Sequence, residues 1–424
     1  MSDGFEIKGT TAKSLSFYNA FLGDNYFQVT AHYSDGTVEG SEIKTLHVTD
    51  KGPRNLKVGK MSNCRDIGGR TTVDGGKIRQ GLLFRTADPS GNVNTDVTTV
   101  LVDQFKVKSE IYVKDGGNAD GSKSPLGTSV KFFNCSMDYG ATPYSNLSRN
   151  AERLRKVFSI LAEGKNYPVM YHCRIGTDRT GVVGILTNGV LGMSFEDVLR
   201  DYGFSNYGTI DGLRYTNKPS DPNGDDPAKY VDEILKMPGA NFQEQCFNAL
   251  RSVGVPQEHI ESFIDIMVEG NKPTNAQKGQ IFTTAEAFGS TGLKISSSTD
   301  YTNPAKYYAV AKNKSVAAKA TTTAQDYSVV VYLGCTNSSS STKLNSGIYL
   351  TIDGKEATIA NTATYQLAGF GTTQQSRRTG YMFEILGKYS FTAGEHTIGF
   401  TTKGSDTFNV AGIHLIPGTA ASYK

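Results

Sequence analysis

The 424-residue sequence has few cysteines and histidines and almost no net charge, and each shortage argues against a class of protein. Its five cysteines form no Cys-x2-Cys pair and its six histidines are scattered, so we expect no structural zinc site, no cofactor and no disulfide framework. The formal net charge of +3 gives no sign of nucleic-acid binding. No apolar run is long enough to span a bilayer, and no signal peptide is visible.

One stretch, from Tyr167 to Gly192, has the pattern of a strand, a tight polar loop and a helix. The apolar run Val169–Tyr171 predicts a buried strand, the loop follows over His172–Arg179, and a helix is expected from Thr180. In this arrangement the backbone N–H groups of the loop converge on one point, where the helix N-terminus adds positive potential. The stretch therefore predicts a cradle for an anion.

Two side chains in this loop can carry chemistry. Cys173 follows the predicted strand, and Arg179 comes six residues later. A thiol in a positive field ionises readily to the nucleophilic thiolate, and the planar guanidinium can hold two oxygens of a phosphate. The Cys-x5-Arg spacing alone also fits a buried cysteine near a surface arginine. The complete pattern favours catalysis because it adds four further residues: His172, Gly176, Thr180 and Gly181.

This pattern resembles the signature loop of the cysteine-dependent protein tyrosine phosphatase superfamily, and its ending GTDRTG is similar to that of the bacterial tyrosine phosphatases. The catalytic domain of that group opens with Asn-x-Arg-Asp-x-Gly-Gly, which here is Asn63–Gly69, followed by the run Gly81–Arg85. The resemblance covers residues 54–272. It implies an α/β catalytic domain that hydrolyses a phosphomonoester, foremost phosphotyrosyl protein, through a phosphocysteine intermediate.

The resemblance also implies roles for the loop residues. Cys173 is expected to be the nucleophile, and Arg179 to clamp the phosphoryl oxygens together with the loop N–H groups. Gly176 is expected to let the loop turn without a Cβ clash. Thr180 is expected to donate its hydroxyl to the sulfur, to act as the helix N-cap, or both. The predicted substrate-contacting residues are His172, Arg174, Ile175, Gly176 and Thr177, with His172 ordering the loop.

Two carboxylates compete for the role of general acid, which must protonate the leaving oxygen. Asp138 lies in Ser136–Pro143, a segment that resembles the mobile acid loop of tyrosine phosphatases but has one extra residue before Pro143 and no Trp-Pro ahead of the aspartate. Asp178 lies in the signature loop itself. We favour Asp178 slightly, because its position beside the phosphate follows from the loop. Asp138 as a turn residue and Asp178 as a partner of helix N–H groups are the structural alternatives.

The substrate class stays open between phosphotyrosine and inositol phosphates or phosphoinositides. Thr177 stands where lipid-directed relatives often carry lysine, which favours phosphotyrosine weakly, while Arg174 is either a substrate contact or a solvated side chain. A third alternative is a catalytically silent surface protein that binds phosphate groups and glycans. The intact Cys173 and Arg179 argue against it.

Both ends of the chain read as β-structure, which makes the predicted fold class multidomain. Residues 1–53 alternate apolar and polar positions and resemble the last strands of a fibronectin type III-like module, so we expect a partial sandwich packed on the next domain. Residues 273–280 read as a linker. Residues 281–424 resemble a jelly-roll carbohydrate-binding module, which implies a glycan as a second partner and a bacterial protein that is secreted or at the cell surface.

Two further predictions concern the start of the C-terminal domain, a strand and a calcium ligand. Ala285–Phe288 reads as a strand. Carbohydrate-binding modules of this type often bind calcium through an early glutamate and a late aspartate. Glu286 matches the first, but Ala411 or Gly412 stands where the second is expected, so Glu286 is alternatively a cap at a strand edge.

Overall fold

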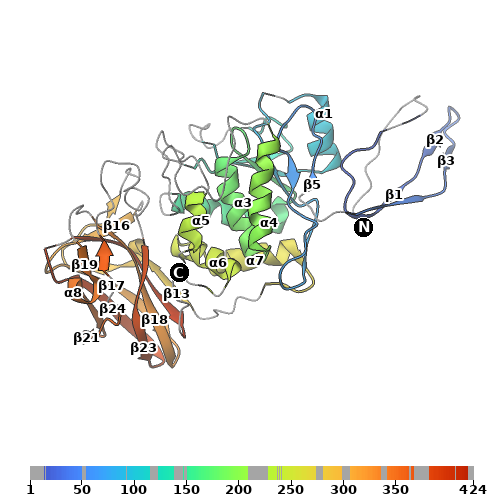
Figure 1. Ribbon diagram of the computed structural model, residues 1–424. Helices are drawn as coiled ribbons and strands as arrows, with labels where there is room; N and C mark the ends of the chain where they lie inside the picture. The colour runs from blue at the N-terminus through green and yellow to red at the C-terminus, as the bar shows by residue number, and fades with distance from the viewer. Residues whose placement is uncertain are drawn as a thin grey trace.

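The computed structural model has three parts along the chain: an N-terminal ribbon of strands, a central α/β domain and a C-terminal β-sandwich (Figure 1). This architecture confirms the predicted multidomain class, an α/β domain joined to an antiparallel sandwich. The residues that the structure describes are 14, 16–49, 54–91, 93–114, 123–137, 147, 150–208, 228–235, 237, 239, 241–273, 280–297, 306–335, 341–361, 364–366, 382–405 and 407–418.

A mixed six-stranded sheet forms the centre of the α/β domain, with strand order β10-β9-β11-β8-β6-β5. Strands β8, β11, β9 and β10 run parallel to one another, and β6 and β5 continue the sheet beyond β8 as antiparallel strands. Every residue of β11 is buried, as expected of a central strand covered on both faces. The strands are β5 (Arg54–Asn55), β6 (Arg65–Asp66), β8 (Leu83–Thr86), β9 (Ser109–Tyr112), β10 (Lys131–Asn134) and β11 (Val169–His172).

Helix α3 (Asp178–Val190) is buried at all of its residues, because other helices cover the sides that do not face the sheet. Those helices carry apolar residues three and four positions apart, which form their buried faces. The remaining helices are α1 (Thr95–Thr98) with its π-helical continuation η1 (Thr99–Gln104), α2 (Ala151–Leu161), η2 (Gly164–Asn166), α4 (Phe195–Gly203), η3 (Phe204–Tyr207), α5 (Ala228–Leu235), α6 (Phe242–Ser252) and α7 (Gln257–Met267). Strands β7 (Lys77–Ile78) and β12 (Val268–Glu269) pair and join the two ends of the domain.

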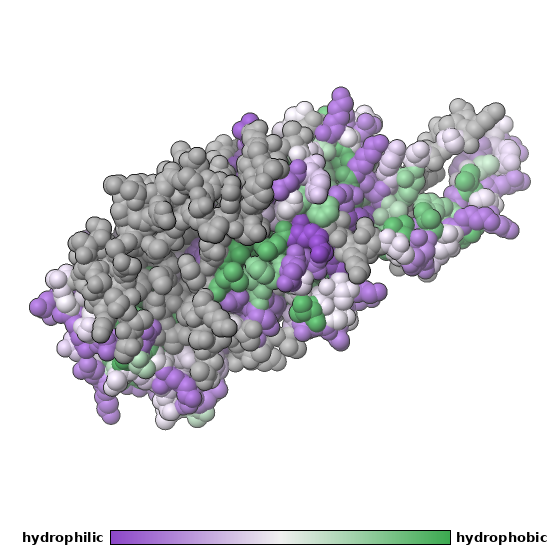
Figure 2. Space-filling model, in the orientation of Figure 1, coloured by the Kyte–Doolittle hydropathy of each residue, from purple (hydrophilic) through white to green (hydrophobic). Residues whose placement is uncertain are grey.

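The N-terminal strands form two separate two-stranded sheets, β1 with β4 and β2 with β3. Their bounds are β1 (Gly23–Phe27), β2 (Thr30–His32), β3 (Val38–Gly40) and β4 (Lys44–Val48). In Figure 1 this ribbon projects from the α/β domain on the side away from the sandwich. The prediction of a partial sandwich packed on the next domain is therefore wrong for the described residues, since most of the ribbon is exposed and Figure 2 shows apolar side chains on its surface.

The C-terminal part is a sandwich of two antiparallel sheets with its own apolar core. One sheet has the order β15-β16-β25-β18-β23, with β13 paired to β25, and the other has the order β14-β17-β24-β20-β21. The strands are β13 (Ile281–Thr284), β14 (Gly289–Ser290), β15 (Ser296–Ser297), β16 (Lys306–Val310), β17 (Ser315–Thr322), β18 (Gln325–Cys335), β20 (Ile348–Ile352), β21 (Lys355–Ala357), β23 (Met382–Phe391), β24 (Gly394–Thr402) and β25 (Phe408–Pro417); β19 (Ser341–Lys343) pairs β22 (Thr364–Gln366), and α8 (Leu344–Gly347) is short. The prediction of a strand at Ala285–Phe288 is wrong, because Ala285–Ala287 is a 3-10 turn and the strand precedes it.

The sandwich packs directly against the α/β domain. Four of its apolar side chains belong to the core of that domain: Val330, Tyr332, Ala411 and Ile416. The Tyr332 hydroxyl donates to Glu233 Oε1 of α5 at 3.2 Å, and Arg251 of α6 lies over the Phe282 ring at 5.2 Å. Burial and the nearby Arg251 charge lower the pKa of His414 on β25 to about 3, so this ring is neutral at neutral pH.

Glu286, the residue considered for calcium, takes part in this contact, with its Oε1 3.8 Å from Arg155 Nη2 on α2. Among the described residues, none of the helices is long and apolar enough to cross a membrane.

Candidate functional site

The candidate site lies at the carboxyl end of β11, where the chain turns through a loop into α3. Cys173 directly follows the strand and is 2% exposed. The loop comprises residues 173–177. Helix α3 then begins at Asp178, two residues earlier than the predicted start at Thr180. Ligands of open α/β sheets bind at such a strand end, and the N-terminus of α3 adds positive potential there. The predicted strand, loop and helix order is thus confirmed.

Four consecutive carbonyl groups of this loop are bonded by groups outside it. Asp88 N–H donates to Arg174 O at 3.0 Å, and Asn63 Nδ2 donates to Ile175 O at 3.0 Å. Arg85 Nη2 donates to Gly176 O at 2.9 Å, while His172 Nδ1 lies 3.1 Å from Cys173 O. Each of these carbonyl oxygens therefore points toward the neighbouring segments of the protein that bond it.

This outside bonding fixes the direction of the loop N–H groups. In a trans peptide the C=O of one residue and the N–H of the next point to opposite sides. Tyr167–Pro168 is the single cis peptide bond among the described residues, so the peptide bonds of the loop are all trans. The N–H groups of residues 174–177 therefore point away from the donors that hold the carbonyls. They form a concave set of donors that suits an anion with several oxygens.

Gly176 has a φ of +72°, a conformation that favours glycine. A Cβ at this position would lie 2.4 Å from Thr86 O on the neighbouring strand. The expectation that Gly176 lets the loop turn without a clash is confirmed on both grounds, backbone conformation and space.

His172 is buried on β11 and faces acceptors on both sides of its ring. Its Nε2 lies 2.9 Å from Glu110 Oε1 on β9, and its Nδ1 faces the Cys173 carbonyl. Glu110 also accepts from the Ser124 hydroxyl, whose oxygen in turn accepts from Leu126 N–H. The two contacts hold the ring between Glu110 on β9 and the first carbonyl of the loop. This geometry supports the predicted ordering role.

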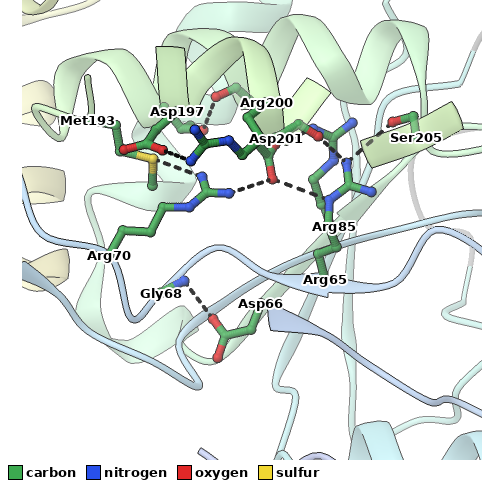
Figure 3. A network of polar contacts seen from close by, with 12 residues as sticks. Arg65, Asp66, Gly68, Arg70, Arg85, Met193, Asp197, Arg200, Asp201 and Ser205 are labelled. Atoms are coloured by element: carbon green, nitrogen blue, oxygen red, sulfur yellow. Dashed lines mark hydrogen bonds and ion pairs between the residues drawn. The ribbon is translucent and has the colours of Figure 1, made fainter. Parts of the chain in front are cut away.

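Beneath the loop, Arg65, Arg70 and Arg85 surround the carboxylate of Asp201 on α4 (Figure 3). Arg85 Nη1 lies 2.6 Å from Asp201 Oδ2, Arg65 Nε lies 3.2 Å from Oδ1, and Arg70 Nη2 lies 3.6 Å from Oδ1. Burial opposes ionisation of Asp201, but the attraction of the three guanidinium groups outweighs it and holds its pKa well below the usual value. Arg85 thus joins this network to the loop.

The Asn-x-Arg-Asp-x-Gly-Gly segment supports the loop from this side. Besides Ile175 O, Asn63 Nδ2 reaches Thr177 Oγ1 at 3.3 Å, and Asn63 Oδ1 accepts from Arg65. Asp66 bonds away from the loop, to the Arg54 guanidinium and to two backbone N–H groups. The segment therefore places structural groups behind the loop rather than in its concave side.

The remaining predicted loop residues lie around the start of α3. Asp178 and Arg179 are in its first turn, each 8% exposed, and Thr177 is the residue before the helix. The reading of Thr180 as the helix N-cap is wrong, because Thr180 is the third residue of α3. Its hydroxyl is buried and makes no hydrogen bond within the described structure. Asp138, the other candidate acid, lies outside the described residues.

Charged side chains of both signs lie beside the loop. Asp88 Oδ2 is 3.2 Å from Lys114 Nζ, which follows β9. Burial would raise the pKa of Asp88, but hydrogen bonds from Ser90, the His172 charge and Lys114 together lower it. The cation at Lys114 is thus matched by an ionised carboxylate.

No sequence motif points to Glu110, Asp88 or Asp201, or to the contact of Arg85 with the loop. Arg85 was noted within a family run, and a buried arginine at a strand end is itself a signal that a carboxylate or carbonyl must meet it. The sequence gives no sign that Asp201, on a helix 116 residues away, is that partner.

Comparison with known proteins agrees with this geometry. Residues 56–114 and 121–270 match the tyrosine phosphatase family. The chain carries a tyrosine phosphatase family domain. A Cupriavidus necator protein that bears the name of a tyrosine-protein phosphatase is 24% identical over 179 residues, which are 37% of this chain and 64% of that protein. The chain thus spans somewhat less than two thirds of that relative.

Two solved structures are similar to separate parts of the chain. The core catalytic domain of the PP-IP phosphatase SIW14 from S. cerevisiae has 18% identity and a TM-score of 0.25, covering 31% of this chain and 75% of that one. A family 35 carbohydrate binding module from Clostridium thermocellum has 12% identity and a TM-score of 0.25, covering 33% of this chain and 98% of that one.

Proposed function

We propose that this protein hydrolyses phosphomonoesters through a phosphocysteine intermediate and that its substrates are phosphotyrosyl proteins. One observation carries the proposal: four consecutive loop carbonyls are held from outside, so the N–H groups of residues 174–177 converge beside Cys173 and the start of α3. Such a set of donors fits the oxygens of a phosphoryl group in the transition state.

In this proposal the Cys173 thiolate attacks phosphorus and forms an S–P bond while the ester O–P bond breaks. Arg179 holds two of the phosphoryl oxygens, and a carboxylic acid protonates the leaving oxygen. Water then attacks phosphorus and gives a proton to the carboxylate left by the first step, while the S–P bond breaks, the thiolate forms again and phosphate leaves. The buried Thr180 hydroxyl, which has no hydrogen-bond partner in the described structure, is available to donate to the departing sulfur.

The balance of charge beside the loop supports phosphotyrosine over inositol polyphosphates. A polyanionic substrate needs several unneutralised cations on the accessible surface around the cradle, where they can contact its outer phosphates. The buried Arg65, Arg70 and Arg85 cannot make such contacts. The Lys114 ammonium lies 3.2 Å from the Asp88 carboxylate, which cancels much of its field. Arg174 then adds one cation to the loop itself. Glycan binding by residues 281–424 and a location at the cell surface stay predictions.

The decisive experiment measures turnover of phosphotyrosyl peptides and inositol phosphates by the full chain without metal. Cys173→Ser should abolish turnover yet retain tungstate binding, because the backbone donors and Arg179 remain. Arg179→Lys should lose most activity, since an ammonium cannot make the two-pronged contact. The matched control is Cys246→Ala, which removes a buried thiol from α6 and should leave kcat/KM within about two-fold. Activity that survives Cys173→Ser would refute the mechanism, and faster turnover of inositol phosphates would refute the substrate class.

The general acid is tested by leaving-group dependence. Replacing the true acid by asparagine should slow phenyl-type esters far more than nitrophenyl esters, which need little protonation. We expect this pattern for Asp178→Asn, because Asp178 lies in the first turn of α3. The same pattern in Asp138→Asn, with both esters slowed alike by Asp178→Asn, would reverse the assignment.

A further inference from the structure

The arginine cluster beneath the loop carries more positive than negative charge. Arg65, Arg70 and Arg85 are each 2% exposed or less, and in the described part of the chain Asp201 is the carboxylate with which they form ion pairs. The nearby buried pair of Arg54 and Asp66 shows the ordinary arrangement, one cation with one anion. The cluster therefore holds about two more positive charges than its carboxylate can balance.

Neighbouring titratable groups do not remove this surplus at neutral pH. Burial raises the pKa of Tyr171 to about 12 and that of Cys64 to about 12, so neither becomes an anion there. Burial and repulsion from Arg85 lower the pKa of Arg65, but only to about 10, so it keeps its proton. A buried unbalanced charge is unfavourable unless an anion lies close.

Arg85 connects the surplus charge to the loop. One of its nitrogens meets Asp201 and another bonds the Gly176 carbonyl, so the guanidinium lies between the cluster and the loop. Burial lowers the pKa of Arg85, but attraction to Asp201 and, more weakly, to Cys173 outweighs burial and raises this pKa. The Cys173 thiolate and a phosphoryl group bound by the loop are therefore two anions that can balance the cluster.

We propose that the cluster of Arg65, Arg70, Arg85 and Asp201 supplies the positive potential that favours the Cys173 thiolate and binds the phosphoryl group. The inference deepens the proposed function and rests on it. Arg85 is a positioning residue, because it also holds the Gly176 carbonyl. Arg70 contributes through charge, since its contacts are with Asp201 and the Met193 sulfur.

Other titratable and charged groups lie on the elements around Cys173, and the test must leave them unchanged. They come from β8 and the chain after it, from β9, from β11, and from the loop and α3: Arg85, Asp88, Glu110, Lys114, His172, Arg174, Asp178 and Arg179. Arg70 contacts none of these in the described structure except through Asp201. Replacing Arg70 therefore changes the charge of the cluster and spares the hydrogen bonds of the loop.

The experiment measures the rate at which iodoacetamide alkylates Cys173 as a function of pH in the full chain, read by mass spectrometry of the peptide. Arg70→Met should raise the midpoint of this profile by about half a unit to one unit. The inorganic phosphate concentration that half-protects Cys173 should rise about three- to ten-fold. Arg70→Lys, which keeps the charge, should restore most of both values. Arg79→Met removes an exposed arginine and should leave both unchanged.

An unshifted midpoint in folded Arg70→Met would overturn the proposal, and so would an equal shift in Arg70→Lys, which would show a structural effect. Should Arg70→Met not fold, Arg70→Gln keeps a polar side chain and is judged by the same criteria. Absence of Cys173-dependent turnover in the unmodified protein contradicts the proposed function instead. An unshifted midpoint in an active enzyme contradicts only the role of the cluster.

Discussion

The α/β domain, which we call the catalytic domain after its proposed function, lies between the ribbon and the sandwich. These two flanking regions differ in what covers their apolar side chains. In the sandwich, the two sheets bury a common core, and Val330, Tyr332, Ala411 and Ile416 extend into the core of the catalytic domain. In the ribbon, Tyr26 is 69% exposed and β2 and β3 are exposed at every residue. Alternating apolar residues occur in both regions, so the alternation alone does not reveal whether a second layer is present.

The ribbon is attached to the catalytic domain at its base. Phe21 lies under the Arg54 guanidinium at 4.4 Å, and Leu22 N–H donates to Gln80 Oε1 at 2.8 Å. Beyond this point the described strands pair only with each other. The ribbon and the sandwich should therefore contribute very differently to the stability of the domain between them.

Removing residues 281–424 should have the largest effect. The catalytic domain would lose the apolar side chains of β18 and β25 that complete its core, and α5 and α6 would lose the contacts of Tyr332 and Phe282. We expect the melting temperature to fall by about 5 °C or more, measured by calorimetry against the full chain. An unchanged melting temperature would mean that the sandwich is only tethered to the catalytic domain.

The two regions can be compared through one tyrosine hydrogen bond in each. Tyr332→Phe removes the bond from β18 to Glu233, and we expect a loss of about 0.5–1.5 kcal/mol in the free energy of unfolding. Tyr33→Phe removes an exposed bond to Glu39 in the ribbon and serves as the matched control, with a change below about 0.5 kcal/mol. Equal losses in urea denaturation would contradict the difference between the two regions.

Excising residues 24–47 and joining the ends with a short glycine linker should have the smallest effect. The exposed strands leave with this segment, while Phe21 and Leu22 stay in place. We expect the melting temperature to change by less than about 2 °C and kcat/KM to stay within about two-fold. A larger fall in stability would show that the ribbon packs on the catalytic domain as first predicted.

At the candidate site, the sequence allowed prediction of the groups that lie close together along the chain. Cys173, Gly176 and Arg179 were recognised from their spacing, and Gly176 has the positive φ that its position required. The helix start was predicted two residues late, because polar residues such as Asp178 occur both in loops and in the first turn of a helix. Thr180 was consequently assigned to the cap although it lies inside the helix.

The sequence by itself determined the strand, loop and helix that present Cys173, because an apolar run, a glycine and a helical pattern act within a few residues of one another. Only the tertiary structure decided which way the loop N–H groups point. The groups that hold the loop carbonyls come from distant segments: Asn63 lies 112 residues from Ile175, and Arg85 lies 91 residues from Gly176. Local preference does not encode such pairings, which form only when the sheet brings the ends of β8 and β11 side by side.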